Sequence, residues 1–369
     1  MNVLDNLKIV CVAAARPNFM KIKPVVASLE AAGHEIVLVH TGQHYDEVMS
    51  GVFFDELGLR MPDRHLGVGS GTHAEQTGRI MVAFETLLDE VVPDLTVVVG
   101  DVNSTLACAL VSAKASIPVA HVEAGLRSRD WAMPEEVNRV VTDRVSDLLL
   151  APSQDAVENL LAEGYRTDQI HLVGNVMIDT LLANVERVSE RNIAADLGVK
   201  GRYGVVTLHR PSNVDDPGVL VGLIAALGQV AQRVPLLFPA HPRTVQRLAG
   251  WDIPAGLRIM DPVGYLDFLS MLSSASIVLT DSGGIQEETT ALGIPCLTLR
   301  ENTERPITVD QGTNFVVGTD PTTIATTALN TLAAPPAPQC PPLWDGRAAE
   351  RIAQVIAAGL PSKRPTELG

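Results

Sequence analysis

The sequence predicts an α/β protein made of two Rossmann-like domains, and two observations point to this. Short runs of β-branched and other apolar residues alternate with longer helical patterns along the 369 residues, as in parallel sheets covered by helices on both faces. The alternation restarts beyond Gly174 and Asn175, and the length is sufficient for two domains with separate cores. Because ligands of such sheets bind beyond the carboxyl ends of the strands, we expect the site in a cleft between the domains.

The strands expected in the first half are short apolar runs bounded by polar or turn residues. The first run has no basic segment before it, so we interpret it as a strand and not as a signal peptide. Pro93 ends a long helical pattern, because proline cannot continue a helix. The expected strands are Lys8–Ala14, Glu35–His40, Leu95–Val99, Pro118–Val122, Leu148–Ala151 and Ile170–Val173, and the expected helices are Phe19–Ala32, His73–Val92 and Ser104–Ser116.

The second half repeats this arrangement, with helical patterns between its strands. A proline-rich stretch follows, which predicts an extended segment before a final helix at about Gly346–Leu360. The expected strands are Tyr203–Leu208, Pro235–Pro239, Leu257–Met260, Ile277–Thr280 and Pro295–Leu299.

The composition excludes several classes of protein. With 28 basic and 43 acidic residues the net charge is −15, which argues against nucleic acid as a partner but leaves room for a small anionic ligand. The four cysteines lie far apart without a CxxC pair, as expected of reduced thiols in a cytoplasmic protein. No stretch approaches the ~18 apolar residues of a membrane helix, so we expect no membrane partner.

Three carboxylates are candidates for acid–base catalysis. Asp101 and Glu123 each follow an apolar strand directly, and Glu135 begins a helix after Pro134. Carboxylates at the carboxyl ends of neighbouring strands can lie close together, which raises some of their pKa values. The alternative for Glu135 and its neighbour Glu136 is an ordinary acid that complements the helix dipole.

Cationic groups and a glycine turn are candidates for binding phosphate. Arg16 follows the first strand and Lys21 lies on the next helix, where backbone N–H groups point toward a ligand; the alternative is two solvated side chains. Ser282, Gly283 and Gly284 join a strand to a helix, and Glu288 lies one turn further. Such a turn lets amides approach a phosphate and the carboxylate accept ribose hydroxyls, although a simple helix cap has the same pattern.

Two histidines follow strands of the second half. His209, with Arg210 beside it, ends one strand, and His241 follows another. Single histidines are more often structural, but two at equivalent strand ends favour a site. No His, Cys or acidic cluster has the spacing of a metal site, so we expect no metal.

Together these motifs resemble the non-hydrolysing UDP-N-acetylglucosamine 2-epimerases. The resemblance spans roughly residues 14 to 318, and the combination is more specific than any single motif. The corresponding segments are ARPNFMKIKPV, TGQH, VVGDVNSTLA, HVEAGLRS, PEEVNR, GNVMIDTL, TLHRPSN, PAHP, TDSGGIQEE and LRENTERP.

The resemblance implies a GT-B-like fold, a homodimer and a C-terminal helix that packs on the first domain. The domains would then be residues 1–173 with 346–369, and residues 174–345. It also implies interconversion of UDP-GlcNAc and UDP-ManNAc by elimination of UDP, reprotonation of C2 on the other face, and re-addition of UDP. Cell-envelope sugars (capsule, wall teichoic acid or antigen) and antibiotic sugars are all compatible with this activity. UDP departure and return replace an oxidation step, so no cofactor is implied.

By their positions in the matching motifs, the resemblance implies that Asp101, Glu123 and Glu135 form the acid–base set. Arg16, Lys21 and His209 lie around the diphosphate and the reacting centre, and Ser282, Gly283, Gly284 and Glu288 hold phosphate and ribose. The family often has GTRPE where this chain has Ala14 to Asn18. The alternatives are a 2-epimerase of a modified UDP-sugar such as a 2,3-diacetamido uronic acid, a GT-B glycosyltransferase, and a catalytically silent UDP-sugar sensor.

The resemblance also implies an activating site for a second UDP-GlcNAc. Gln43, Glu136, Arg210 and His241 correspond to it, whereas Asp46 and Ser70 depart from it. A carboxylate at Asp46 repels a diphosphate and offers no N–H. We therefore expect weak or absent activation.

Overall fold

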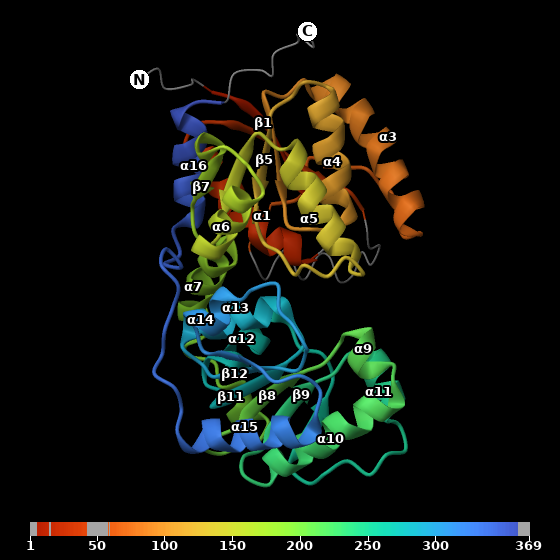
Figure 1. Cartoon of the computed structure of the whole chain (residues 1–369), viewed down its shortest axis with the longest axis vertical. Coiled ribbons are helices and arrows are strands. Elements are labelled where there is room, and N and C mark those ends of the chain that lie inside the picture. The colour runs from red at the N-terminus through yellow and green to blue at the C-terminus, as the bar shows by residue number, and fades with distance from the viewer. Residues whose placement is uncertain (1–5, 15, 43–57, 59, 361–369) are drawn as a thin grey trace. The chain divides into compact units, whose positions relative to one another are not determined.

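The computed structural model describes residues 6–14, 16–42, 58 and 60–360, with the backbone alone for Arg16 and Pro17. The chain divides into two compact units. Unit 1 contains residues 1–180 and 342–369, and unit 2 contains residues 181–341. Each unit holds one parallel sheet (Figure 1), so the predicted α/β class with two parallel sheets is confirmed.

Unit 1 has a seven-stranded sheet of order β3-β2-β1-β4-β5-β6-β7 in its described residues. The order reverses between β1 and β4, which creates the crevice where such sheets bind ligands. The strands are β1 (Lys8–Ala13), β2 (Glu35–His40), β3 (Arg64–His65), β4 (Leu95–Val99), β5 (Val119–Val122), β6 (Leu148–Ala151) and β7 (Ile170–Leu172). The helices are α1 (Arg16–Ala31), α3 (His73–Val91), α4 (Asn103–Lys114), α5 (Pro134–Val145), α6 (Gln154–Ala162), η1 (Thr167–Gln169), α7 (Val176–Val188), which runs on into unit 2, and α16 (Ala348–Ala358).

Helices of unit 1 pack in two groups. The helices α3, α4 and α5 pack in sequence beside one another (Figure 1) and bury Phe84, Val10 and Val98 in a shared core. Helix α16, from the far end of the chain, packs against α1. Its first amides, of Ala348 and Ala349, donate to the carboxylate of Asp179 on α7 at 3.0 and 2.7 Å. Helix α16 is therefore built into unit 1.

Unit 2 has a six-stranded sheet of order β10-β9-β8-β11-β12-β13 among the described strands, with the reversal between β8 and β11. Helices α10 and α15 pack together over an apolar core that includes Phe238 and Leu279. The strands are β8 (Gly204–Thr207), β9 (Leu236–Pro239), β10 (Leu257–Met260), β11 (Ile277–Thr280), β12 (Cys296–Thr298) and β13 (Asn314–Val316). The helices are α8 (Ile193–Asp196), α9 (Pro211–Val214), α10 (Pro217–Ala231), α11 (Pro242–Leu248), α12 (Tyr265–Ser273), α13 (Gly283–Leu292), α14 (Ile307–Asp310) and α15 (Pro321–Ala333).

The strands predicted from apolar runs are confirmed to within about two residues, and two differences have clear causes. Helix α1 begins at Arg16 and not at Phe19, because Pro17 suits the first turn of a helix. The edge strands β3 and β13 were not predicted, since Arg64–His65 is polar and Asn314–Val316 is only three residues long. Within the described residues, no helix is long and apolar enough to span a membrane.

Candidate active site

The carboxyl ends of β4 and β5 carry the acidic residues that the sequence singled out in unit 1. Asp101 lies two residues beyond Val99, the last residue of β4, and Glu123 follows β5 directly. The two strands are hydrogen-bonded neighbours with Val99 opposite Val122. The predicted position of both acids at adjacent strand ends is therefore confirmed.

Glu123 forms a buried ion pair with Lys21 of α1. The Nζ of Lys21 lies 2.6 Å from Oε2 of Glu123, and both side chains are almost fully buried. The other oxygen, Oε1, is buried and has no hydrogen-bond partner among the described residues. The backbone of Glu123 has a φ of +73°, an uncommon conformation for a residue with a side chain. Unpaired buried oxygens and strained backbones are typical of functional sites.

Gly100 allows the β4 loop to approach this ion pair. A Cβ on Gly100 would lie 3.3 Å from Nδ2 of Asn18 and 3.6 Å from both Oε2 of Glu123 and Nζ of Lys21. Its φ of +74° also favours glycine. Asn18, in the segment that departs from the family pattern, donates from Nδ2 to the Val99 carbonyl at 3.0 Å. The loop that carries Asp101 is therefore packed against the Lys21–Glu123 pair.

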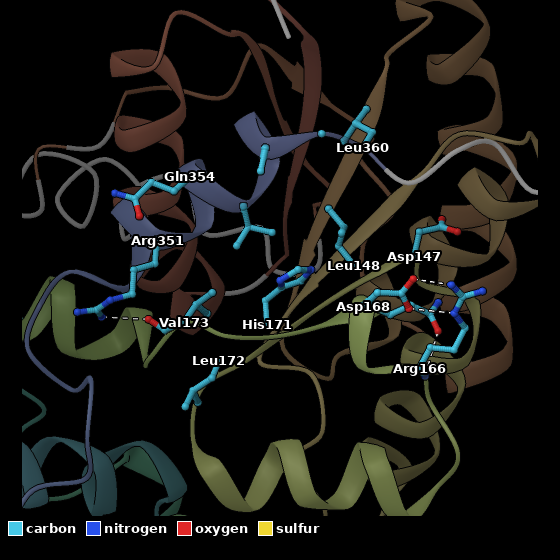
Figure 2. A pocket seen from close by; sticks show the side chains of 14 residues that line it. Asp147, Leu148, Arg166, Asp168, His171, Leu172, Val173, Arg351, Gln354 and Leu360 are labelled. Carbon is cyan, nitrogen blue, oxygen red and sulfur yellow. Dashed lines mark hydrogen bonds and ion pairs between the residues drawn. The ribbon is translucent and has the colours of Figure 1, made fainter. Parts of the chain in front are cut away.

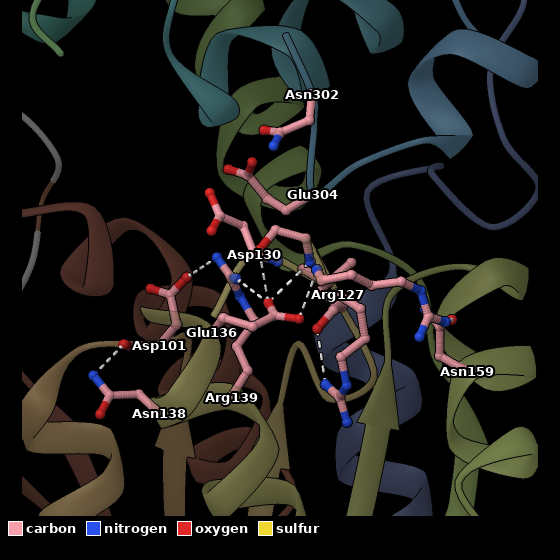
Figure 3. A network of polar contacts seen from close by, with 12 residues as sticks. Asp101, Arg127, Asp130, Glu136, Asn138, Arg139, Asn159, Asn302 and Glu304 are labelled. Carbon is pink, nitrogen blue, oxygen red and sulfur yellow. Dashed lines mark hydrogen bonds and ion pairs between the residues drawn. The ribbon is translucent and has the colours of Figure 1, made fainter. Parts of the chain in front are cut away.

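Asp101 is held by two residues of α5. The Nη2 of Arg139 lies 2.5 Å from Oδ2 of Asp101, and Nδ2 of Asn138 donates to the Asp101 carbonyl at 2.9 Å (Figure 3). The Asp101 side chain remains about a quarter exposed. It is thus fixed in place and still reachable by a ligand.

Of the two adjacent acids on α5, Glu136 has the structural role. Its carboxylate accepts hydrogen bonds from the amides of Ser128 and Arg129 at 2.9 and 2.8 Å and pairs with Arg139 at 2.8 Å. Burial opposes ionisation, but these donors outweigh it and lower the pKa of Glu136. Glu135 is half-buried, and its side chain makes no hydrogen bond or ion pair with any residue that the structure describes. Glu136 is therefore held by structural contacts, and Glu135 stays the predicted member of the acid–base set.

In unit 2, His209 is oriented by a buried carboxylate that sequence reasoning missed. The Nδ1 of His209 lies 2.8 Å from Oδ1 of Asp281. Asp281 is fully buried and also accepts from the amides of His209 and Arg210, both at about 3.0 Å. Burial opposes its ionisation, but His209 and the amides outweigh this and lower the pKa of Asp281. With Nδ1–H directed at a carboxylate, Nε2 is the nitrogen of His209 that can exchange a proton.

A buried ionic cluster lies beside His209 and Arg210. Arg210 approaches Glu304 at 3.7 Å, and Glu304 also pairs with Arg300 at 2.9 Å and with Arg305 at 2.6 Å. Arg305 in turn pairs with Glu287 of α13 at 2.8 Å. The segment LRENTERP thus connects the β8 loop to α13. Its contacts with Arg210 and Glu287 join residues far apart in the sequence, so spacing gave no signal for them.

The two glycines at the start of α13 differ in their surroundings: neighbouring side chains pack against Gly283, whereas there is free space beside Gly284. A Cβ on Gly283 would lie 2.5 Å from Nη1 of Arg305 and from Oε1 of Glu304, so the ionic cluster requires glycine there. A Cβ on Gly284 would meet nothing within 4 Å. The side chain of Ser282 does not cap the helix. Gly284 and Ser282 therefore leave room at the helix start, whereas Gly283 is explained by packing.

Glu288 is a buried acid in the middle of α13. Burial, reinforced by the neighbouring Glu287 carboxylate, raises the pKa of Glu288 to about 8. The hydroxyl of Tyr265 on α12 is buried nearby, and burial and the Glu288 charge raise its pKa. Glu288 is thus a mostly protonated acid at neutral pH that a hydrogen-bonding ligand can convert to the carboxylate.

The remaining predicted residues are less well defined. His241 is exposed after β9, and its Nδ1 accepts from the Arg243 amide at 3.3 Å as the cap of α11. Arg16 lies in the first turn of α1, but its side chain is not described. Gln43 and Asp46 lie outside the described residues.

A pocket of about 860 Å³ lies elsewhere in unit 1, between β7 and α16 (Figure 2). It is lined by His171, Leu172 and Val355 among others, and by none of the predicted site residues. Within the described part of the chain, no group of three or more His, Cys, Asp or Glu side chains could hold a metal ion.

Known proteins match nearly the whole chain. A family model described as UDP-N-acetylglucosamine 2-epimerase matches residues 27–357. The UDP-N-acetylglucosamine 2-epimerase of Methanococcus maripaludis is 41% identical over 330 residues, which cover 86% of this chain and 89% of that protein. The UDP-2,3-diacetamido-2,3-dideoxy-D-glucuronate 2-epimerase of Pseudomonas aeruginosa is 38% identical over 357 residues, covering 95% and 99%.

A solved structure agrees in fold. The crystal structure of Methanocaldococcus jannaschii UDP-GlcNAc 2-epimerase in complex with UDP-GlcNAc and UDP matches with a TM-score of 0.87 and 40% identity. The match covers 96% of this chain and all of that one. With the parallel sheets, the acids at the strand ends and these matches, the chain belongs to the UDP-N-acetylglucosamine 2-epimerase family of isomerases.

Proposed function

We propose that this protein interconverts UDP-GlcNAc and UDP-ManNAc by inverting the configuration at C2 of the sugar. A base removes the proton from C2, the electron pair forms the C1–C2 double bond, and the bond from C1 to the UDP oxygen breaks with its electrons on UDP. An acid then returns a proton to the opposite face of C2, and the UDP oxygen adds back to C1. The reaction is neutral in electrons and protons, so it needs no redox cofactor.

The single observation that carries the proposal is that Oε1 of Glu123 has no hydrogen-bond partner among the described residues. A buried carboxylate oxygen without a hydrogen bond costs about 1–3 kcal/mol, and here it is held rigidly by the ion pair with Lys21. A substrate that donates a proton or a hydrogen bond to Oε1 offsets this cost. Glu123 is therefore a proton-transfer group, with Asp101 on the adjacent strand end and Glu135 on α5 as the other members of the acid–base set.

The cations of the site support departure of UDP. On the family resemblance, Lys21, Arg16 and His209 are the groups that balance the charge that develops on the diphosphate oxygen as the C1–O bond breaks. The Asp281 carboxylate holds the His209 ring in place through Nδ1, at 2.8 Å. These side chains make elimination of a charged leaving group possible.

The nucleotide is held by unit 2 in this proposal. The amides at the start of α13, around Ser282, Gly283 and Gly284, donate to phosphate at the positive end of the helix. Glu288 accepts hydrogen bonds from the ribose hydroxyls, and Arg210 and His241 supply further donors. The open space at Gly284 supports close approach of a ligand at this turn.

A second substrate has specific support. The Pseudomonas aeruginosa relative, named for a diacetamido glucuronate, is nearly as similar as the relatives named for UDP-GlcNAc. We also propose, on the family resemblance, a homodimer in the cytoplasm. Light scattering on the purified protein would then give twice the mass of the chain.

The test is product formation from each substrate. Incubation with UDP-GlcNAc should give UDP-ManNAc by ¹H NMR until both sugars reach a constant ratio, and UDP-ManNAc alone should give the same ratio. The diacetamido uronate substrate is assayed in parallel. A much higher kcat/KM for the diacetamido uronate than for UDP-GlcNAc would show that the uronate is the substrate. If the protein turned over neither sugar, the proposal would be contradicted.

A further inference from the structure

A histidine outside the proposed catalytic set links the two strand ends that carry the acids. His121 lies on β5, two residues before Glu123, and its side chain is fully buried. Its Nδ1 is 2.6 Å from Oδ1 of Asp143 on α5. Its Nε2 is 2.9 Å from the carbonyl oxygen of Gly100, the residue before Asp101.

Both neighbours of the ring accept hydrogen bonds. A backbone carbonyl has no hydrogen to donate, and an ionised carboxylate has none either. Asp143 also accepts from the Gly125 amide at 3.0 Å and pairs with Arg127 at 2.7 Å. Burial opposes ionisation of Asp143, but its pKa is lowered, and the part of this lowering that comes from the charge and hydrogen bond of Arg127 does not depend on the state of the ring. A neutral imidazole would therefore place one lone pair against an oxygen lone pair in a dry interior.

We propose that His121 is a buried imidazolium that positions the acids Asp101 and Glu123. This role rests on the function proposed above, because it concerns the same acids. His121 itself is a positioning residue and takes no part in proton transfer to the sugar.

The surroundings of His121 balance its charge. Arg127 bridges Asp143 and Glu163, with its Nη2 2.7 Å from a carboxylate oxygen of each. His121 and Arg127 thus face Asp143 and Glu163, two positive charges against two negative ones. Tyr165 is also near, but burial and the Asp143 charge raise its pKa to about 12, so it adds no charge. An unpaired buried cation would be costly, and this one is paired.

The hydrogen bond to Gly100 fixes the peptide that leads into Asp101. The Gly100 amide donates to the Val122 carbonyl at 3.1 Å, and its carbonyl accepts from His121, so both sides of Gly100 are attached to β5. Gly100 packs against the Lys21–Glu123 pair. A ring with two N–H donors therefore sets the β4 loop, and with it Asp101, relative to Glu123.

Nuclear magnetic resonance tests the protonation state directly. The nine histidines are labelled with ¹⁵N in the ring, and the signals of His121 are those that disappear in the H121Q variant. At pH 8, above the ordinary histidine pKa of about 6.5, both ring nitrogens of His121 should carry a bound hydrogen. One protonated and one bare nitrogen at that pH would overturn the imidazolium.

Kinetics test the positioning role. D143N removes the counter-charge, so His121 should become neutral and kcat should fall at least about tenfold with KM nearly unchanged. D147N is the matched control, because Asp147 caps the other end of β5 by accepting from the Val119 amide at 3.0 Å; its kcat should stay near that of the unaltered chain. Equal kcat in both variants would overturn the positioning role. If D143N does not fold, the kcat of H121Q is compared with that of D147N instead, and equal values would overturn the positioning role.

The two proposals can fail separately. If the unaltered chain turns over no UDP-sugar, the proposed function fails, while the NMR signals still report the state of His121. If turnover is normal and His121 is neutral, the function stands and this inference fails.

Discussion

Glu123 combines three features that cost stability. It is buried, its backbone lies in the left-handed region, and one of its oxygens has no partner among the described residues. Strained backbone and an unsatisfied buried oxygen each cost about 1–3 kcal/mol. Such costs persist where function requires the geometry. Neutralising Glu123 should therefore remove its chemistry, and it also leaves the buried charge of Lys21 without its carboxylate, which costs some stability.

The first prediction concerns the acids. Glu123→Gln and Asp101→Asn should each lower turnover by roughly 10²–10⁴-fold, the contribution of one general acid or base. Circular dichroism should show the fold unchanged. The exposed Glu85 of α3 gives a matched control, and Glu85→Gln should keep full activity. Near-normal turnover in both acid variants would remove them from the catalytic set.

The second prediction concerns Glu288 and pH. With its pKa raised to about 8 by burial and by Glu287, Glu288 is protonated in the free protein below pH 8. Ribose hydroxyls favour the carboxylate, so binding releases a proton and UDP affinity should rise from pH 6 to 8. The affinity for UDP should rise by at most about tenfold per pH unit, because one proton is released.

Calorimetry at several pH values measures this slope. Glu288→Gln cannot ionise, so it should weaken UDP binding by about 1–3 kcal/mol and reduce the slope to that of UDP itself. The same slope in both proteins would show that Glu288 does not hold the ribose.

Side-chain hydrogen bonds attach helix α16 and the segment before it to unit 1, although their partners lie far away in the sequence. Asp179 of α7 accepts from the first amides of α16, and Trp344 donates from Nε1 to the Pro152 carbonyl at 3.0 Å. A helix of this length is marginal alone, so its apolar face and these contacts hold it on unit 1.

The third prediction follows from that attachment. Asp179→Ala should lower the free energy of unfolding by about 1–3 kcal/mol, because two buried amides lose their acceptor. Urea unfolding measures this. Asp168→Ala removes an exposed ion pair with Arg166 and should leave the free energy nearly unchanged. Equal effects of the two substitutions would contradict the capping role.

Strands and helices with long apolar runs could be predicted from the sequence. Elements that depend on hydrogen bonds to distant segments could not. Strands such as Leu95–Val99 are fully buried and mostly apolar, and a glycine or an acid follows them. Strand β13 depends on Asn314, which donates to Gln286 and Thr308 at 3.1 Å. Those contacts come from the tertiary structure, so the local pattern does not show them.

Across the complete chain, the sites at strand ends followed from topology. Both sheets reverse their order beside the first strand of the unit, so Asp101, Glu123 and His209 could be selected because they follow strands. The residues that orient these side chains could not be predicted from the sequence. Asp281 reads as part of a glycine turn and His121 as part of a strand, and their roles depend on contacts between distant segments.

The most direct test of the account is transfer of solvent hydrogen to C2 of the sugar. The protein is incubated with UDP-GlcNAc in deuterated water, and the C2 hydrogen is followed by ¹H NMR and mass spectrometry. Removal and return of the C2 proton predict one deuterium at C2 in UDP-GlcNAc and in UDP-ManNAc, and Glu123→Gln should slow this strongly. Formation of UDP-ManNAc that keeps its original C2 hydrogen, or no exchange at all, would contradict the account.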